Sequence, residues 1–499
     1  MVKRQKKLPK ALKKLSKPGN KTVPGLLIAA PASNSGKTVI TLGILRALAN
    51  RGQPVVAAKA GPDYIDPAFQ QAASRRLCIN LDPWAMSDHA IKALADWHVG
   101  PPDGGRFLLC EGAMGLFDGA AGGGGSSADL AALMDWPVVL VIDVRGQAAS
   151  AAAIIQGFVR FRADVRIAGV ILNRVGSARH RDLIMAACAQ AIPDIPIIGA
   201  VMREDALSLP ERHLGLVQAG EHPALEAFLD HASTIIERDI DLDRFLQLAG
   251  VAPVARNLAN IPEQGDASPQ TSVPRPVSSS SDVLSHHPHR NGWFDGASDN
   301  APVLIAPLGR HIAVARDAAF AFCYPHLIAG WEAAGARIDY FSPLANQAPA
   351  QHCDAIYLPG GYPELHAADL AKADRFMTAL RDAARRGLPV YGECGGYMVL
   401  GDILVDGAGK RHQMAGLLPL ETSFEQRRLH LGYRQVEISQ DCPLGRSGMV
   451  LRGHEFHYAS TIRADGPGWL MARTADGQDL GPCGLQNGSV FGSFFHLIC

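Results

Sequence analysis

The sequence lacks an excess of charge of either sign, because 48 lysines and arginines are matched by 48 aspartates and glutamates. A strongly basic chain would have indicated nucleic acid as a partner, and this balance gives no such indication. The sequence also has no uninterrupted apolar run of about 18 residues, the length that a membrane-spanning helix needs. We therefore expect neither nucleic-acid nor membrane partners, and we leave a homodimer open.

Paired cysteines are also missing. The chain has nine cysteines, scattered and without a Cys-x-x-Cys pair, so neither a zinc knuckle nor a disulfide framework is indicated. This usage fits a reducing compartment, and we expect a cytoplasmic protein. Most free cysteines are small buried apolar side chains, and we expect that for every one except Cys394.

Large apolar residues are scarce between about residues 253 and 300, where Pro, Ser, Asn, Gln and His dominate. Such a segment cannot bury enough surface to fold, so residues 251–300 are predicted to be a disordered linker. On either side, residues 24–250 and 301–499 alternate β-branched runs with Ala-rich stretches. This pattern predicts an α/β fold of two doubly wound, mostly parallel-sheet domains.

The first 23 residues are rich in lysine and run into a short apolar stretch, an order that imitates a secretory signal. We favour another interpretation, because this stretch leads directly into a candidate nucleotide-binding loop. Leu26-Leu-Ile-Ala-Ala30 is then a buried strand, and residues 1–23 form a basic disordered tail.

The candidate loop is Pro31-Ala-Ser-Asn-Ser-Gly-Lys-Thr38, followed by a predicted helix over Val39–Asn50. A phosphate loop needs backbone N–H groups facing the phosphates, a lysine for charge and a hydroxyl for Mg²⁺. The usual leading glycine is absent, since Pro31 stands in its place. Between a strand and a helix the motif still predicts ATP binding by Ser35, Gly36, Lys37 and Thr38.

Two further predicted strands end in acidic residues. The strand that begins at Val55 leads to Asp63 and Asp66, and the strand that begins at Phe107 ends at Glu111, before Asp118. The carboxyl ends of strands in a doubly wound sheet meet at one edge, where ligands bind. Mg²⁺ prefers oxygen ligands and bridges ATP phosphates. We therefore predict a Mg²⁺ site made of Thr38, Asp63 and Glu111.

Near the C-terminus, Gly392, Cys394 and Gly396 have the spacing of a nucleophile elbow with sulfur in place of the serine oxygen. The glycines allow a sharp turn between a strand and a helix. The N-terminus of that helix is expected to lower the thiol pKa of Cys394. A thiolate is a nucleophile for acyl transfer, so this segment predicts a second reactive site.

Several segments resemble the cobyrinic (or hydrogenobyrinic) acid a,c-diamide synthase family. In the first half they are residues 29–38, 59–67, 110–119 and 210–215. Residues 358–364, 392–396 and 453–458 resemble the family's class I-like glutamine amidotransferase domain. The resemblance covers residues 24–250 and 301–499. It implies a dethiobiotin-synthetase-like ATP domain that, with ATP, Mg²⁺ and L-glutamine, converts the a- and c-acetate carboxylates of a corrin to amides in cobalamin biosynthesis.

Roles within the ATP domain follow from the resemblance and from position. The residues expected at the phosphate or at the substrate carboxylate are Lys59, Tyr64, Asp66 and Asp118. Asn173 ends a further strand, and it either contacts adenine or belongs to a simple turn. Arg212 and His213 either contact nucleotide or corrin carboxylates or cap a helix.

In the second domain, the resemblance makes His496 the base that activates Cys394. The backbone amides of Gly361 and Gly395 are the expected oxyanion hole. Many amidotransferases carry a glutamate two residues after this histidine, and here Ile498 stands there. We therefore expect a Cys–His dyad. His454 and His457 either substitute for His496 or, as we favour, have structural roles near the domain interface.

Two other classes of protein are alternative interpretations of the same motifs. A nucleotide switch would use the second domain for docking and would not need Cys394 or His496, and a stand-alone cysteine hydrolase would use ATP only for regulation. Within the ligase class, a cobyric acid synthase-like enzyme would amidate other corrin side chains. Ammonia must reach the acyl phosphate unprotonated, so the coupled mechanism further predicts that the two sites face each other.

Overall fold

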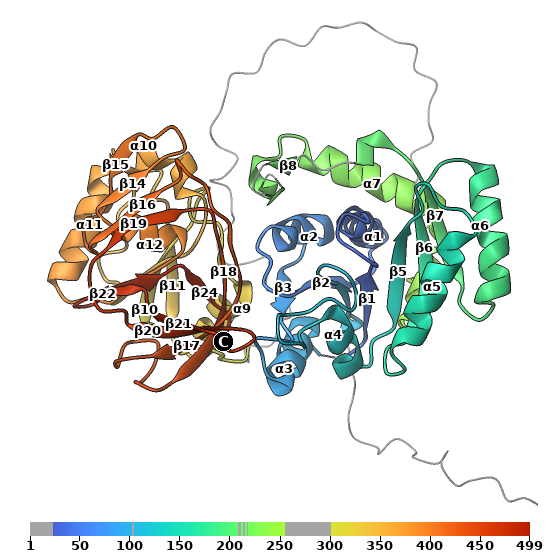
Figure 1. The fold of residues 1–499 in the computed structure, drawn as a ribbon, viewed down its shortest axis with the longest axis horizontal. Coiled ribbons are helices and arrows are strands. Elements are labelled where there is room, and N and C mark those ends of the chain that lie inside the picture. The colour runs from blue at the N-terminus through green and yellow to red at the C-terminus, as the bar shows by residue number, and fades with distance from the viewer. Residues whose placement is uncertain (1–22, 102–103, 208–210, 213–214, 217, 255–300) are drawn as a thin grey trace, which may run out of the picture.

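The computed structural model describes residues 23–101, 104–207, 211–212, 215–216, 218–254 and 301–499. The expected basic tail and linker lie outside these residues, apart from positions 23 and 251–254. The described chain forms two lobes that lie side by side, the N-terminal lobe on the right of Figure 1 and the C-terminal lobe on the left. No helix within the described ranges is long and apolar enough to cross a membrane.

A seven-stranded sheet forms the centre of the N-terminal lobe, in the order β3-β2-β4-β1-β5-β6-β7, and every pairing in it is parallel. Along β1, Leu27 and Ala29 face one core while Leu26 and Ile28 face the other. Burial on both faces explains the nearly continuous apolar runs of these strands. The strands are β1 (Gly25–Ala29), β2 (Val55–Ala60), β3 (Cys78–Leu81), β4 (Phe107–Glu111), β5 (Val138–Asp143), β6 (Ile167–Val175) and β7 (Ile197–Met202).

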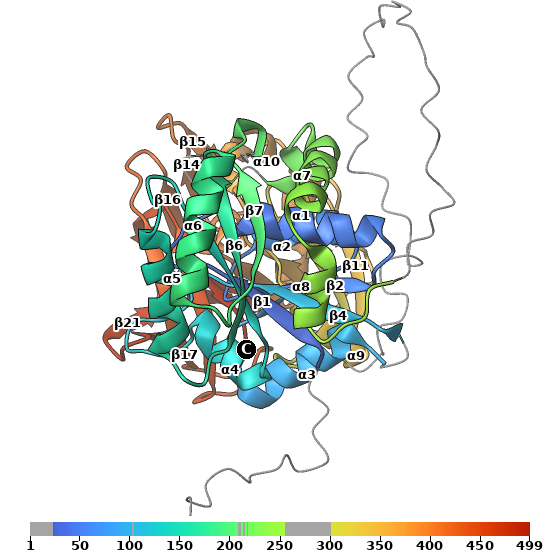
Figure 2. The same ribbon diagram turned by 90° about the vertical axis from the view of Figure 1, so that its right-hand side faces the viewer.

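Helices cover both faces of this sheet, as Figure 2 shows from the side. One face packs against α1 (Lys37–Asn50), α2 (Asp66–Ser74), α7 (Leu225–Asp239) and α8 (Leu242–Leu248). The other packs against α3 (Asp88–Val99), α4 (Ser127–Met134), α5 (Ser150–Phe161) and α6 (Ala178–Ala191). A two-stranded ribbon of β8 (Glu211–Arg212) and β9 (Gly215–Leu216) precedes α7.

The C-terminal lobe contains a six-stranded sheet in the order β11-β10-β12-β13-β23-β22, parallel except at its β22 edge. Its strands are β10 (His311–Ala315), β11 (Arg337–Phe341), β12 (Ala355–Leu358), β13 (Val390–Glu393), β22 (Leu485–Asn487) and β23 (Val490–Ser493). Its helices are α9 (Pro325–Ala333), α10 (Ala367–Leu370), α11 (Asp374–Arg385) and α12 (Gly395–Leu400). The expected α/β class, with parallel sheets in both halves, is confirmed.

Two further sheets were not expected. A four-stranded sheet joins β14 (Ile403–Val405), β15 (Arg411–Gln413), β16 (Leu420–Ser423) and β19 (Ser460–Ala464). An antiparallel five-stranded sheet joins β17 (His430–Ile438), β18 (Val450–His457), β20 (Leu470–Thr474), β21 (Asp479–Cys483) and β24 (Phe495–Leu497). The second of these sheets matters for function, because β24 carries His496.

Candidate active site

The phosphate loop lies between β1 and α1, and Asn173 at the end of β6 holds it in place. Gly36 has a φ of 88°, and a Cβ at this position would lie 2.2 Å from Asn173 Nδ2. The same Nδ2 donates a hydrogen bond to the Ser35 carbonyl at 2.9 Å, and Asn173 Oδ1 accepts one from the N–H of Arg174. The side chain expected at adenine or in a turn therefore uses both of its polar groups to support the loop.

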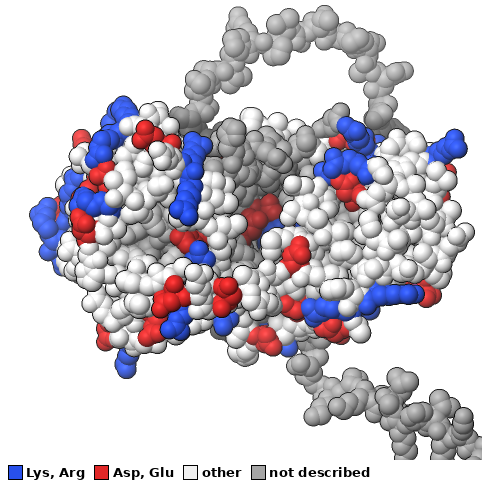
Figure 3. Space-filling model, viewed as in Figure 1, with Lys and Arg blue, Asp and Glu red and all other residues white. Residues whose placement is uncertain are grey.

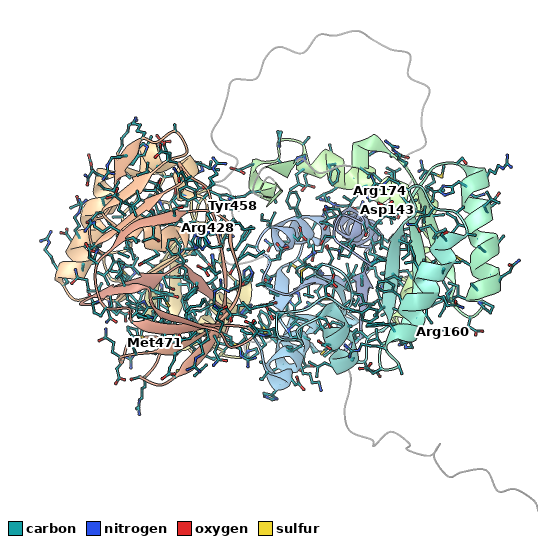
Figure 4. All side chains as sticks on the ribbon, viewed as in Figure 1. Asp143, Arg160, Arg174, Arg428, Tyr458 and Met471 are labelled. Atoms are coloured by element: carbon teal, nitrogen blue, oxygen red, sulfur yellow. The ribbon has the colours of Figure 1, made fainter. Side chains whose placement is uncertain are left out.

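A cavity of about 600 Å³ adjoins the loop. It is lined by Pro31–Ser35 and, from the end of β5, by residues that include Asp143 and Gln147. Asp143 forms an ion pair with Arg174 at 2.6 Å, and Figure 4 shows these two side chains together at the edge of the sheet. Lys37 Nζ donates to the Met114 carbonyl at 2.7 Å, and burial lowers the pKa of Lys37. This cavity has the position that a nucleotide on the loop requires.

Beside the loop, Lys59 joins two buried acids. Its Nζ lies 2.6 Å from Asp66 Oδ2 and 2.9 Å from Glu111 Oε1. Burial alone would lower the pKa of Lys59, but the two carboxylates outweigh it and hold that pKa well above its usual value. Thr38 Oγ1 donates to Glu111 Oε1 at 2.8 Å and lies 3.5 Å from Asp66 Oδ2. A hydroxyl and two carboxylates thus converge at the start of α1.

Asp63 lies elsewhere than expected. Its Oδ1 accepts hydrogen bonds from the N–H groups of Ile65 and Asp66 at 2.8 and 3.0 Å, so it shapes the turn into α2. Burial, with the nearby Asp66, raises the pKa of Asp63 to about 7. Asp66 therefore takes the place beside Thr38 that we expected for Asp63. Asp118 is exposed, and its Oδ2 accepts from the N–H of Gly115 at 3.0 Å.

The donor set at Thr38, Asp66 and Glu111 fits Mg²⁺, which prefers hard oxygen ligands. Sequence reasoning missed Gln70, whose Nε2 donates to Glu111 Oε2 at 2.6 Å and orients that carboxylate. Gln70 stands four residues after Asp66 on α2. The two side chains therefore share a helix face, a spacing that could have identified Gln70.

In the C-terminal lobe, Cys394 lies on a strained turn between β13 and α12, with a φ of 47° that a side chain rarely adopts. A Cβ at Gly395 would lie 3.0 Å from Gly361 N, so the two expected oxyanion-hole residues are adjacent. A Cβ at Gly396 would lie 2.0 Å from the Leu358 carbonyl. Close backbone approach therefore requires glycine at these positions.

The second expected catalytic residue, His496, lies buried on β24. Neither ring nitrogen has a hydrogen-bond partner among the described residues, and Nδ1 lies 3.9 Å from Glu393 Oε2. Burial, with the neighbouring His454 and His457, lowers the pKa of His496 to about 3. Burial also raises the pKa of the Cys394 thiol, contrary to our expectation, because desolvation outweighs the N–H of Gly395. Both shifts favour the neutral forms, a thiol at Cys394 and an imidazole at His496.

The two candidate sites adjoin at Tyr64. This residue lies in the β2–α2 loop between Asp63 and Asp66, and its ring centroid is 4.7 Å from that of His496. Tyr64 also packs on Tyr324 at 4.5 Å and on Phe322 at 5.4 Å, both from the C-terminal lobe. A side chain expected at the substrate therefore contacts the histidine of the other lobe.

A second set of contacts joins the lobes, and we call it the Trp84 cluster: Asp82, Trp84, Tyr433 and Arg452. The Tyr433 ring stacks on Trp84 at 4.5 Å, and the Arg452 guanidinium lies 4.9 Å from the Trp84 ring centroid. Tyr433 donates to Asp82 Oδ2 at 3.1 Å. Figure 3 shows a hollow between the lobes, with acidic side chains inside it.

The sequence left the roles of His454, His457, Arg212 and His213 open. The His454 ring lies 5.6 Å from Tyr433, and His457 contacts Glu455 at 3.0 Å and stacks on Phe494 at 3.9 Å. These contacts agree with structural roles. Arg212 belongs to β8, and His213 lies outside the described residues.

Comparison with known proteins defines the class of each lobe. Residues 26–217 match the family described as the CobQ/CobB/MinD/ParA nucleotide binding domain, and residues 311–499 match the CobB/CobQ-like glutamine amidotransferase domain. The chain thus couples a nucleotide-binding domain, of the kind that implies ATP, to a glutamine amidotransferase domain.

Curated relatives narrow this class further. Hydrogenobyrinate a,c-diamide synthases from Brucella anthropi and Brucella abortus are 51% and 52% identical to this chain, each over 95% of the chain and 98% of the relative. The protein of that name from Rhizobium meliloti is 47% identical over 95% of the chain and 99% of the relative. The chain belongs to the hydrogenobyrinate a,c-diamide synthase family. The expected family is confirmed, and with it an amidating ligase that uses glutamine.

Proposed function

We propose that this protein converts the a- and c-acetate carboxylates of hydrogenobyrinate to amides, with ATP as the activating substrate and L-glutamine as the nitrogen donor. The observation that carries the proposal is the high identity, over nearly the whole chain, to relatives named for this reaction. The contact between Tyr64 and His496 supports it further, because it brings an ATP-side loop to the glutaminase histidine.

The ligase half solves the problem that a carboxylate is a poor electrophile. The γ-phosphoryl group of ATP is transferred to the carboxylate, which gives an acyl phosphate and ADP. Lys37 and the loop N–H groups bind the phosphates, and Lys59 balances negative charge. Mg²⁺ held by Thr38, Asp66 and Glu111 would neutralise charge that develops on the phosphate oxygens.

The glutaminase half releases ammonia from glutamine. His496 accepts the Cys394 proton while the sulfur attacks the side-chain amide carbon, and the N–H groups of Gly361 and Gly395 stabilise the oxyanion. The imidazolium of His496 then protonates the departing amino group, so that the C–N bond breaks and neutral ammonia leaves the thioester. Water hydrolyses the thioester, so glutamate is released and the thiol is regenerated.

Ammonia passes from one half to the other at the lobe interface. Free ammonia at pH 7 is mostly ammonium, which has no lone pair with which to attack the acyl phosphate. Transfer past Tyr64, whose ring contacts His496, keeps the molecule unprotonated until it displaces phosphate from the acyl carbon. The hollow between the lobes is the place that we assign to the corrin.

A Cys394→Ala variant tests this proposal. We expect it to lose glutamine-dependent amidation and to keep amidation driven by concentrated ammonium salt at alkaline pH, since only the sulfur nucleophile is missing. Cys442→Ala, a half-buried cysteine on a turn in the same lobe, is the matched control and should keep both activities. Product mass from hydrogenobyrinate, with the cobalt-loaded ring as a second acceptor, reports amidation. Glutamine-dependent turnover by Cys394→Ala would overturn the mechanism.

A further inference from the structure

Glu393 is a buried acid beside the catalytic pair, and the mechanism above does not use it. It is the last residue of β13, directly before Cys394, and is 1% exposed. A buried carboxylate is costly unless it is hydrogen-bonded. Its surroundings therefore indicate what it does.

Three donors fix the Glu393 carboxylate. Oε1 accepts hydrogen bonds from the Tyr391 hydroxyl at 2.8 Å and from the N–H of Leu497 at 3.2 Å. Oε2 accepts one from the Tyr357 hydroxyl at 2.8 Å. Donors on both oxygens favour the ionised acid, which is an acceptor only. Because Leu497 follows His496 on β24, the carboxylate also ties down the strand that carries the histidine.

Oε2 accepts this one hydrogen bond, from Tyr357, among the described residues, and His496 Nδ1 lies 3.9 Å from it. That nitrogen has no hydrogen-bond partner among the described residues, although the ring is almost completely buried. Catalytic hydrogen bonds are often long in ligand-free structures and shorten when substrate binds. A closure of about 1 Å would make this contact an ordinary hydrogen bond.

We propose that Glu393 is the positioning residue of the glutaminase: its carboxylate accepts the Nδ1 proton of His496, which leaves Nε2 free to take the Cys394 proton. It supplies the carboxylate that related enzymes carry two residues after the histidine, where this chain has Ile498. The inference rests on the glutaminase function proposed above. The protonated imidazole formed during turnover then lies beside an anion, as in other catalytic triads.

Replacement of Glu393 by Gln tests the role, because the amide keeps the size of the side chain and loses the charge. We expect the glutamine-dependent kcat to fall by about 100-fold or more, because exchanging the carboxylate that orients a catalytic histidine for an amide costs up to about 10⁴-fold. The KM for glutamine and the ammonium-driven rate should stay unchanged. Glu421→Gln removes a buried carboxylate that is paired with Arg411 on another sheet, and it should keep full glutamine-dependent turnover.

Tyr357→Phe gives a readout that a purely structural role would not change. The titratable groups around Glu393 are Tyr357, Tyr391, His496, Cys323, Tyr324, Tyr64 and Cys394. Burial raises the pKa of Glu393 to about 7, and the Tyr357 hydroxyl opposes this rise. Loss of the hydroxyl raises the pKa further. The acid limb of the glutamine-dependent kcat should therefore move to higher pH, and the ammonium-driven profile should not move.

The outcomes separate this inference from the function on which it rests. If Cys394→Ala is inactive with glutamine while Glu393→Gln keeps full kcat, the positioning role is wrong and the glutaminase function stands. If Glu393→Gln loses both activities, the variant is misfolded, and the positioning role is then tested by the pH profile of the glutamine-dependent kcat of Tyr357→Phe. An unmoved acid limb in Tyr357→Phe would then overturn the inference.

Discussion

Asp63 and Asp66 show how strongly the role of one carboxylate depends on its position in a turn. Asp63 accepts two backbone N–H groups and shapes the start of α2, whereas Asp66 points toward Thr38 and Lys59. An asparagine keeps an acceptor oxygen but loses the charge. With asparagine the turn at Asp63 can still form, whereas the negative charge that Asp66 places beside Thr38 and Lys59 is lost.

We therefore predict different results for the two aspartates. Asp66→Asn should lower ATP-dependent amidation by about 100-fold or more and should raise the Mg²⁺ concentration needed for the half-maximal rate. Asp63→Asn should have a much smaller effect, because its turn can still form. Glutamine hydrolysis should persist in both variants. Initial rates measured over a range of Mg²⁺ concentrations test this, and equal losses in the two variants would contradict the assignment.

At the scale of elements, the sequence identified the strands whose ends carry the chemistry. β1, β2, β4 and β13 were all expected, because apolar runs that lead into Gly, Asp or Glu have a clear physical cause in a parallel sheet. The direction in which each side chain of a loop points was harder to predict. Asp63, Tyr64 and Asp66 are polar neighbours, and only the path of the backbone decides which points where.

Contacts between distant elements left no local signal in the sequence. In the sequence, Glu393 is one more residue of the cysteine motif, and only the position of β24 in the fold brings His496 close to it. Tyr64 likewise meets its partners only through the packing of the two lobes. Pairing between strands far apart in the chain determines these positions, and residue patterns within one strand do not record it.

The loop between β3 and α3 carries Asp82 and Trp84 of the Trp84 cluster, and we predict that Trp84→Ala loosens the coupling of the two reactions. The change removes stacking with Tyr433 and a cation–π contact with Arg452, each worth about 0.5–2 kcal/mol. More glutamine should be hydrolysed for each amide formed, while the ammonium-driven rate persists. The ratio of glutamate to amide product measures this effect.

The matched control for Trp84→Ala lies within the C-terminal lobe. There Arg316 lies 4.9 Å from the Tyr340 ring centroid, the same distance as between Arg452 and Trp84. Tyr340→Ala removes a comparable contact without touching the interface, so its ratio of glutamate to amide should equal that of the unchanged protein. A normal ratio in Trp84→Ala would show that the cluster does not support coupling.

At the scale of the whole molecule, buried acids and buried histidines affect stability in opposite directions. Burial raises the pKa of Asp63, Glu364 and Glu393 to about 7 and that of Asp82 to about 6. Each acid binds its proton more tightly when folded, so its contribution is lost as pH rises through the folded pKa. Burial lowers the pKa of His98, His326 and His454 to about 4, so their contribution is lost as pH falls below 6.5.

From this balance we predict a stability maximum near pH 6.5 and a decline on its alkaline side. Between pH 7 and 8 the histidines are mostly neutral in both the folded and the unfolded state, so the acids determine the slope. We expect the Tm to fall by about 2–4 °C over this range, as a loss of about 1 kcal/mol would cause. Thermal unfolding in buffers of equal ionic strength measures it. Glu393→Gln should flatten the decline, and a Tm that rises with pH would refute the account.

The placement of Tyr64 also bears on how this protein could be inhibited. Its ring fills a recess among Phe322, Tyr324 and His496, and its loop leads into Asp66, the first residue of α2. A small planar compound in that recess would displace the Tyr64 ring and shift the ligase loop, and at the same time it would contact His496. Since it would resemble neither ATP nor glutamine, an excess of either substrate would not relieve the inhibition. The junction of the lobes is thus a target for noncompetitive inhibitors that stop both reactions with one molecule.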